Sequence, residues 1–383
     1  MKHMKNIIKS VVRHVLFAGY YLYSIVAVPI TYNRAFKHGE LTYLSKEDFG
    51  IWKKAMLAML KEYCFAGYNF RVRQVVYTFA NSKVEVVRKT APCSRKNPIV
   101  VLCIKNDLKR IQMLVDHYRK LGVEKFAFMD NGSDDGTFEW LQEQPDIDLY
   151  RCYEPYQTAV KEGWINRIVS QYGFDRWYIV TDTDELCTYI GMENHPVKDV
   201  ARVAGNRGIK RVKGLTLDMY ADGQPFGNTD DIRRDYCWMD YNTYFETEAR
   251  AGNTKFNAFL GGPRYRLMNS RITLSKFPLI YWEKGTVSDS AHFQFPHNKL
   301  PDYECYIGIQ HYKFIDKDLD VYRKRAKGDS GFSSGGLMYK QYMDYVEKTG
   351  AANFMYGDSI RFDGSESLKQ IPLITDMELN NFS

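Results

Sequence analysis

Residues 99–107, IVVLCIKND, decide the fold that this sequence predicts. They form a continuous apolar run of strand length that ends abruptly in polar residues, which is typical of a strand buried on both faces of a sheet. Residues 108–122 follow with apolar positions at helical spacing and a closing glycine, which predicts an amphipathic helix. Residues 123–137, VEKFAFMDNGSDDGT, then repeat the change from strand to polar turn.

The same alternation continues along the chain. We expect a helix at about 138–144, a strand in IDLYRCY (147–153), a helix at about 158–172 and a strand in RWYIV (176–180). Strands that alternate with helices predict a parallel α/β sheet with crossover connections. Ligands bind beyond the carboxyl ends of the strands in such sheets. The polar segments KND, DNGSDDG and DTDE are therefore expected on one rim.

The flanking regions are less regular. Apolar spacing predicts a helix in residues 46–63, whereas residues 69–89 alternate and are rich in valine, which predicts one or two strands. We expect further strands of a mixed region in 208–223 and 269–285, helices within 312–350, and a loosely ordered finish over the last thirty residues. The expected segments are 1–35, 36–97, 98–205, 206–325 and 326–383.

Composition indicates a globular protein. The 383 residues are 45% hydrophobic, 15% aromatic and 26% charged, with a net charge of +7. This charge suits contact with phosphates or an anionic membrane surface, but the basic residues are dispersed, so we expect no nucleic-acid binding. Seven cysteines without any CxxC pair disfavour a zinc ribbon or a disulfide framework and favour a reducing compartment.

The N-terminus has some membrane character. Lys2, Lys5, Lys9 and Arg13 precede an uncharged run over residues 15–32. Eighteen residues is the lower limit for spanning a bilayer, and glycine, serine, proline and four tyrosines dilute this run. Three interpretations stay open: a signal anchor, an in-plane membrane-docking helix, or a helix packed on the domain.

Carboxylates are crowded at the end of the strand in WYIVTDTDEL (177–186). Asp182 and Asp184 in D-x-D spacing can jointly hold a hard cation such as Mg²⁺ or Mn²⁺, often together with substrate phosphates. A solvated acidic turn is the alternative, which the preceding apolar strand disfavours. Asp130, in DNGSDDGT, either closes a capped strand-to-helix turn or accepts hydrogen bonds from a nucleobase or ribose.

Taken in order, IKND, DNGSDDGT and WYIVTDTDEL resemble the family 2-like glycosyltransferases of the GT-A fold, in particular a bacterial branch with a D-x-D-E motif. Later blocks, GGPRYRLMNSRITLSKFPLIYW, SAHFQFP and IQHYKF, are similar in order and character, so the resemblance covers about residues 98–325. It implies a Rossmann-like, mostly parallel sheet with flanking helices and a mixed C-terminal region. Residues 98–205 would bind the nucleotide sugar, residues 206–325 the acceptor, and residues 326–383 would form a helical tail.

The resemblance also implies roles for particular residues. Asp182 and Asp184 would hold a divalent cation, Mn²⁺ or Mg²⁺, with the donor diphosphate, and His311 would complete the metal shell, with His292 as a competitor. Glu185 would face the acceptor or brace the site. The remaining donor-binding candidates are Asn106, Asp107, Asp130, Asn131 and Asp135 on the nucleoside side, and Lys276 with Arg264 or Arg266 on the diphosphate side.

The expected reaction is transfer of a sugar from a nucleotide-diphosphate donor to a glycan or lipid-linked acceptor. Asp218 or Asp222 is favoured as general base over Asp235, Asp240 and Asp289, although no spacing selects one, and the stereochemistry stays open. A nucleotidyltransferase acting on sugar phosphates would need a phosphate loop that IKNDLKR does not provide. A non-catalytic glycan-binding module would have lost its acids.

The scattered thiols and the short stem favour a role in bacterial surface polysaccharide synthesis over a membrane-spanning enzyme of a Golgi-type secretory pathway. We expect a cytoplasmic enzyme that is peripheral to the inner membrane, with a single-pass signal anchor as the alternative.

Overall fold

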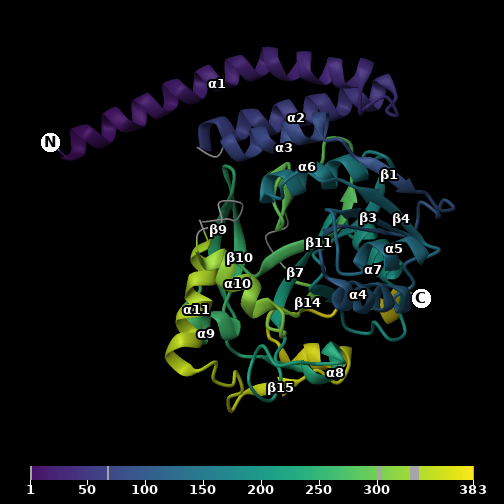
Figure 1. Cartoon of the computed structure of the whole chain (residues 1–383), viewed down its shortest axis with the longest axis vertical. Helices are drawn as coiled ribbons and strands as arrows, with labels where there is room; N and C mark the ends of the chain where they lie inside the picture. The colour runs from purple at the N-terminus through teal and green to yellow at the C-terminus, as the bar shows by residue number, and fades with distance from the viewer. Residues whose placement is uncertain (1, 67–68, 301–303, 328–335, 383) are drawn as a thin grey trace.

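A computed structural model describes residues 2–66, 69–300, 304–327 and 336–382. Its centre is a nine-stranded sheet with the strand order β1-β4-β3-β2-β5-β11-β7-β14-β6 (Figure 1). The strands of this sheet are β1 (Glu85–Arg88), β2 (Ile99–Ile104), β3 (Phe126–Asp130), β4 (Ile147–Arg151), β5 (Arg176–Val180), β6 (Glu185–Thr188), β7 (Arg211–Asp218), β11 (Ser275–Trp282) and β14 (Ile307–His311).

Six of these nine strands run in the same direction. β2 pairs in parallel with β3 and β5, β3 with β4, and β7 with β14, whereas β11 lies antiparallel between β5 and β7. β1 and β6 are antiparallel edge strands. The α/β class with a mostly parallel sheet is thereby confirmed, and residues 98–205 and 206–325 contribute strands to the same sheet.

Four helices follow strands of the sheet, and the first three of them, which connect β2, β3, β4 and β5, were predicted from the sequence, whereas the fourth was not. They are α4 (Leu108–Lys120), α5 (Thr137–Glu143), α6 (Thr158–Val169) and α7 (Val197–Asn206). Helix α4 turns its apolar side to the sheet, where Ile111, Leu114, Val115 and Tyr118 are buried. Because these crossovers bring each strand back in the same direction, the polar turns after β2, β3 and β5 meet on one rim.

Three helices at the N-terminus form a layer over this domain (Figure 1): α1 (Lys2–His38), α2 (Lys46–Ala66) and α3 (Asn69–Asn81). The helix expected in 46–63 is confirmed, but the prediction of strands over 69–89 is wrong for most of that range, because only β1 is extended. Val72, Val75, Val76 and Phe79 are buried at helical spacing. Burial of this stripe against the neighbouring helices outweighs the strand preference of valine.

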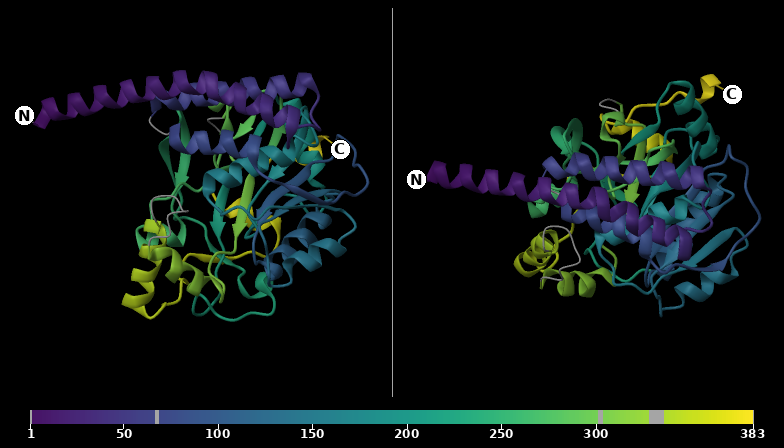
Figure 2. Two further views of the ribbon diagram at one scale, coloured as in Figure 1. Left: turned by 45° about the horizontal axis from the view of Figure 1, so that its top comes forward. Right: turned by 90° about the horizontal axis from the view of Figure 1, so that it is seen from above.

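Helix α1 extends well beyond the body of the molecule (Figure 2). Its last turns are covered, since Tyr32 and Ala35 are buried, whereas most side chains before Ala27 whose exposure the structure describes are exposed. Among the described residues, none of the helices combines the length and apolar character needed to cross a bilayer.

The C-terminal half adds smaller elements around the sheet. They are α8 (Ile232–Asp235), β8 (Trp238–Asp240), β9 (Phe245–Ala251), β10 (Thr254–Leu260), α9 (Gly262–Met268), β12 (Val287–Ser288), β13 (Gln294–Phe295), α10 (Asp318–Ala326), α11 (Leu337–Thr349), β15 (Ser359–Arg361) and the 3₁₀ turns η1 (His297–Lys299), η3 (Ser365–Gln370) and η4 (Leu379–Phe382). Strands in 208–223 and 269–285 and helices within 312–350 are confirmed.

The last thirty residues are more ordered than expected. β15 pairs with β8, and Leu368, Ile371, Met377 and Leu379 are buried in the same apolar core as the sheet. The prediction of a loose finish overlooked these apolar side chains, which are spread among polar residues without a regular period. The six cysteines whose side chains are described are free thiols.

Candidate functional site

The site is built by the register of three neighbouring strands. β14 lies between β7 and β6, and His311 at its end is paired with Asp218 on β7 and with Glu185 on β6. The backbone N–H of Tyr312 donates to the carbonyl of Asp184 at 2.8 Å, which ties the turn after β5 to the end of β14. Side chains far apart in sequence thus meet at one end of the sheet.

Asp184, Glu185 and His311 form the core of this cluster. Each has a ligand atom within 4.8 Å of those of the other two. His311 Nε2 lies 3.3 Å from Asp184 Oδ2, and Nδ1 lies 2.7 Å from Asp218 Oδ1. Burial lowers the pKa of His311, but Asp184 and Asp218 raise it by more, so that it lies above its usual range. The imidazole is therefore held between two carboxylates.

Asp182 lies beside this trio, and lysines rather than the histidine balance its negative charge. It accepts hydrogen bonds from Lys161 and Lys276, the latter at 3.4 Å, and Lys276 also pairs with Glu185. Burial raises the pKa of Asp182, but the two lysines outweigh this and hold it below the usual range. The crowded acids at the end of the predicted strand thus each have a cationic partner.

The turn after β2 joins the same rim. Thr183, between the two aspartates of the D-x-D segment, donates to Asp107 Oδ2, and Lys317 pairs with Asp107 Oδ1 at 2.6 Å. Asp107 is 8% exposed. The structure therefore brings Asp107 into contact with the acidic segment.

The DNGSDDGT turn is held mainly by its own hydrogen bonds. Asp130 is fully buried and accepts from the backbone N–H of Gly132 at 3.0 Å and of Ser133 at 3.2 Å, while Arg151 pairs with it at 3.2 Å. Asn131 donates to the carbonyls of Cys152 and Glu154. A nucleoside contact by either side chain would have to compete with these bonds.

Asn106 and Asp135 connect this turn to the first one. Asn106 donates to Asp134 Oδ1 at 2.7 Å and accepts from its backbone N–H at 2.8 Å. Asp135 accepts from the backbone N–H of Thr137 at 3.0 Å and of Leu108 at 3.4 Å. Asn106 and Asp135 thus align the turns after β2 and β3.

The expected cations separate into two groups. Lys276 lies in the acid cluster, as described above. Arg264 lies behind it and donates to Asp218 Oδ2 at 2.6 Å. Arg266 pairs with Asp240 at 3.0 Å and donates to the carbonyl of Phe354. Lys276 is therefore the only one of the three that touches the D-x-D-E segment.

His292, the competing metal candidate, packs near Lys276. Its Nδ1 lies 3.0 Å from the carbonyl of Ser275, and burial, followed by the charge of Lys276, lowers its pKa to about 3. A neutral imidazole is expected there, outside the trio that contains His311.

The candidate bases are dispersed. Asp218 is fully buried and uses both oxygens, for His311 and Arg264. Asp222 is exposed, with Asn353 Nδ2 at 3.4 Å from its Oδ1. The other three have partners elsewhere: Asp235 binds Thr229, Asp240 binds Tyr220 and Asp289 binds His297.

Two lysines that were not among the predicted site residues also lie near the acids. Lys161, on the first turn of α6, pairs with Asp182, and Lys313 is close enough for its charge to help lower the pKa of Asp184. Lys313 lies in the quoted block IQHYKF and could have been noted there. No motif marks Lys161, because its position depends on how α6 packs against the sheet.

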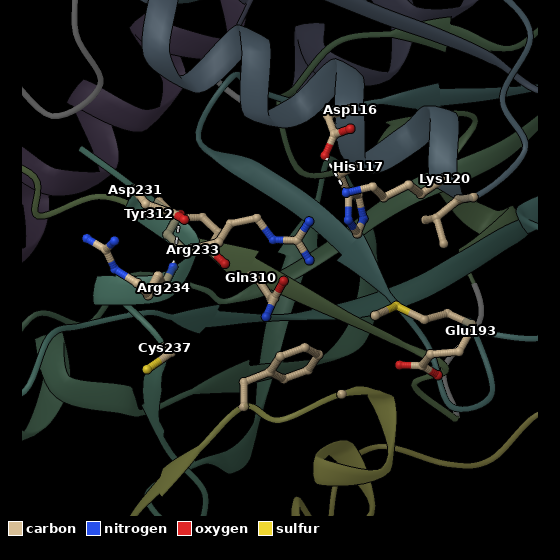
Figure 3. Close-up of a pocket in the computed structure, with 14 residues that line it drawn as sticks. Asp116, His117, Lys120, Glu193, Asp231, Arg233, Arg234, Cys237, Gln310 and Tyr312 are labelled. Carbon is tan, nitrogen blue, oxygen red and sulfur yellow. Dashed lines mark hydrogen bonds and ion pairs between the residues drawn. The ribbon is translucent and has the colours of Figure 1, made fainter. Parts of the chain in front are cut away.

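A cavity lies elsewhere, away from the acid cluster (Figure 3). It measures about 720 Å³, and its lining includes His117, Arg233, Gln310 and Phe362 but none of the acid cluster. Gln310 precedes His311 on β14, and successive residues of a strand point to opposite faces. The cavity is therefore separate from the rim where the motifs meet.

No family model matches this chain, and no curated protein sequence does. Among solved structures, a mannosyltransferase from Pyrobaculum calidifontis in complex with GDP-Man and Mn²⁺ is 16% identical with a TM-score of 0.24, over 44% of this chain and 47% of that one. HddC from Yersinia pseudotuberculosis is 12% identical with a TM-score of 0.29, over 59% and 96%. The chain thus spans about half the length of the mannosyltransferase, and similarity at this level says nothing about its activity.

The donor set fits a hard divalent cation. Carboxylate oxygens are the ligands of Mg²⁺ and Mn²⁺, and imidazole is compatible with Mn²⁺. Asp218 lies at Nδ1 of His311, where metal-binding histidines commonly have a carboxylate partner that orients the ring. The trio Asp184, Glu185 and His311 fits such an ion. Asp182 lies outside the trio and is expected to position Lys161 and Lys276, with which it pairs.

Proposed function

We propose that this protein is a glycosyltransferase that moves a sugar from a nucleotide-diphosphate donor to a glycan or lipid-linked acceptor. The observation that carries the proposal is the acid cluster itself. Asp184, Glu185 and His311 converge at the rim of a mostly parallel sheet, with two lysines beside them. Oxygen-rich metal ligands next to lysines that are paired with carboxylates of the same cluster suit a sugar diphosphate.

Donor binding is assigned to the rim. A divalent cation held by Asp184, Glu185 and His311 would supply Lewis-acid neutralisation of the diphosphate charge. Lys161 and Lys276 lie on Asp182 in the free protein and can turn their ammonium groups to phosphate oxygens when the donor binds. Asp107, joined to the segment through Thr183, would contact the nucleoside, in competition with its present partners Thr183 and Lys317.

The acceptor hydroxyl needs a general base. Between the two favoured aspartates, exposure supports Asp222, because Asp218 is fully buried and has both oxygens engaged. We assign to Asp218 the positioning of His311, whereas the ion pair of Glu185 with Lys276 would orient Glu185 as a ligand of the cation.

We also propose where the enzyme acts and how the chain is divided. The basic, largely exposed helix α1 and the scattered thiols support a cytoplasmic enzyme peripheral to a bacterial inner membrane that builds a surface polysaccharide. Residues 98–205 would provide the nucleotide-sugar half, residues 206–325 the acceptor half, and residues 1–35 the membrane contact.

The test is a screen of nucleotide sugars for release of the nucleoside diphosphate, with Mn²⁺, with Mg²⁺ and with chelator. We expect turnover of at least one donor that requires the cation. Asp184→Ala should abolish it, and Asp320→Ala, which removes an exposed acid on α10 with a side chain 80% exposed, should leave it unchanged. Cation-dependent turnover that survives Asp184→Ala would refute the site.

A further inference from the structure

Exposed apolar surface is concentrated on helix α1. Among the described residues, twelve of the twenty large apolar side chains that are most exposed lie on it, each at least 42% exposed. These twelve are Met4, Ile7, Ile8, Val11, Val12, Val15, Leu16, Leu22, Tyr23, Ile25, Val26 and Ile30. So much uncovered apolar surface on one element marks a contact surface.

The first half of the helix has a clear two-sided pattern. From Met4 to Leu16 the exposed apolar residues recur every three to four positions, whereas exposed polar residues occupy the positions between them: Lys5, Lys9, Ser10 and His14. With 3.6 residues per turn, this spacing gathers the apolar side chains into one stripe. The stripe begins before the uncharged run of residues 15–32. Its apolar residues alternate with lysines and an arginine in the sequence, so that average hydropathy does not reveal it.

The charge of the helix points to the chemistry of what it meets. Helix α1 contains six lysines and arginines and no aspartate or glutamate. An apolar stripe flanked by basic side chains complements a bilayer surface with anionic headgroups. A purely apolar protein partner would not account for the presence of basic side chains and the absence of acidic ones on this helix.

The base of the helix is fixed to the protein. The Tyr32 hydroxyl donates to the carbonyl of Val76 at 2.8 Å, and Phe36 stacks on Phe49 with ring centroids 4.5 Å apart. Helix α3 in turn packs on α6, which carries Lys161 to Asp182. The projecting part of α1 therefore continues from the layer formed by α2 and α3 (Figure 2), and this layer contacts the helix that carries Lys161.

We propose that residues 4–16 of α1 lie in the plane of an anionic bilayer, with the apolar stripe among the acyl chains and with Lys5 and Lys9 at the headgroups. This deepens the peripheral location proposed above and rests on that part of the proposed function. It is independent of sugar transfer, because binding to lipid needs neither donor nor cation.

The test is co-sedimentation of the full chain with vesicles of phosphatidylcholine, with and without phosphatidylglycerol, at low and high salt. We expect binding to the anionic vesicles only, weakened by salt. Ile8→Ser with Val11→Ser should abolish binding, and Lys5→Gln with Lys9→Gln should weaken it roughly fivefold per basic side chain removed. Matched controls are Val86→Ser and Leu337→Ser, which remove exposed apolar groups elsewhere and should bind as the wild type does.

Other outcomes would overturn the proposal. Equal binding of the stripe variant and the wild type would exclude the stripe as the lipid contact. A wild type that is a dimer in sedimentation velocity and binds no vesicles, and that becomes monomeric in Ile8→Ser with Val11→Ser, would show that a second copy covers the stripe.

Thermal melts should agree among all variants, because the altered side chains are exposed. A chain that binds vesicles but turns over no donor would contradict the transferase and leave this proposal intact.

Discussion

Two histidines, His311 and His297, each lie between two carboxylates, but their surroundings differ. His297 Nδ1 is 2.8 Å from Glu62 Oε1 on α2, and Nε2 is 2.9 Å from Asp289 Oδ2. Asp289 also accepts from the Tyr63 hydroxyl at 2.6 Å. His297 is fully buried. This arrangement joins the N-terminal helical layer to the segment around β12 and β13.

His311 is placed for a different purpose. One of its carboxylates, Asp218, is buried and also bound by Arg264, whereas the other, Asp184, has a side chain 19% exposed and lies beside Glu185. The comparison teaches that a histidine between two acids is not by itself a site. A site also needs a third ligand and a partly open side, and His311 has both.

The largest expected effect separates the two histidines by activity. His311→Gln removes a proposed ligand of the cation and should lower cation-dependent donor turnover by more than 100-fold, beyond the roughly 10- to 100-fold cost of losing an outer partner. His297→Gln should retain turnover within about twofold at a temperature where both variants are folded. Steady-state assays of the two variants, each with a thermal melt, check this, and equal losses would remove the distinction.

The next effect concerns stability. Burial lowers the pKa of His297, but its hydrogen bonds to Asp289 and Glu62 raise it to about 9, above the ordinary value of 6.5. The stabilisation by this histidine is therefore fully present below about pH 6.5 and is lost as the pH rises through about 9. It amounts to about 3 kcal/mol.

Denaturation at pH 6 and pH 10 measures this contribution. The wild type should lose more free energy of unfolding between these pH values than His297→Gln does. A wild type and a variant with the same pH dependence would show that His297 is not protonated between its two carboxylates.

A smaller effect tests the role of Asp218. If it orients His311, Asp218→Asn should weaken Mn²⁺ binding roughly 10- to 100-fold, so that added Mn²⁺ restores much of the turnover. If it is the general base, Mn²⁺ affinity should stay unchanged and kcat should fall at saturating Mn²⁺. A titration of turnover against Mn²⁺ distinguishes these results.

The smallest effect concerns the lysines. Lys161→Met should raise the KM for the donor by about tenfold, because a charge-assisted contact to phosphate is worth roughly 1.5 kcal/mol. Lys120→Met, which removes an exposed lysine paired with Asp116, is the matched control and should not change KM. An unchanged KM in Lys161→Met would mean that Lys161 stays on Asp182 when the donor binds.

The parallel part of the sheet could be predicted from the sequence, because each strand there is a continuous apolar run that ends in a polar turn. Helix α3 was not predicted, although Val72, Val75, Val76 and Phe79 have helical spacing, because valine-rich alternation also suits a strand. The end of the chain buries apolar residues that follow no period.

The site divides in the same way. Asp184 and His311 were expected together, and the structure places them 3.3 Å apart. The place of Glu185 in the trio depends on the register of β6 against β14, and the contact of Lys161 with Asp182 depends on the packing of α6. Neither register nor packing follows from motif spacing along one chain.

The most direct test of the central claim is Mn²⁺ binding, measured by electron paramagnetic resonance in the absence of any donor. We predict one bound Mn²⁺ per wild-type chain, retained in His297→Gln and lost or strongly weakened in Asp184→Ala and His311→Gln. A wild type that binds no Mn²⁺, or a His311→Gln variant that binds it as tightly as the wild type, would contradict the assignment of Asp184, Glu185 and His311 as a cation site.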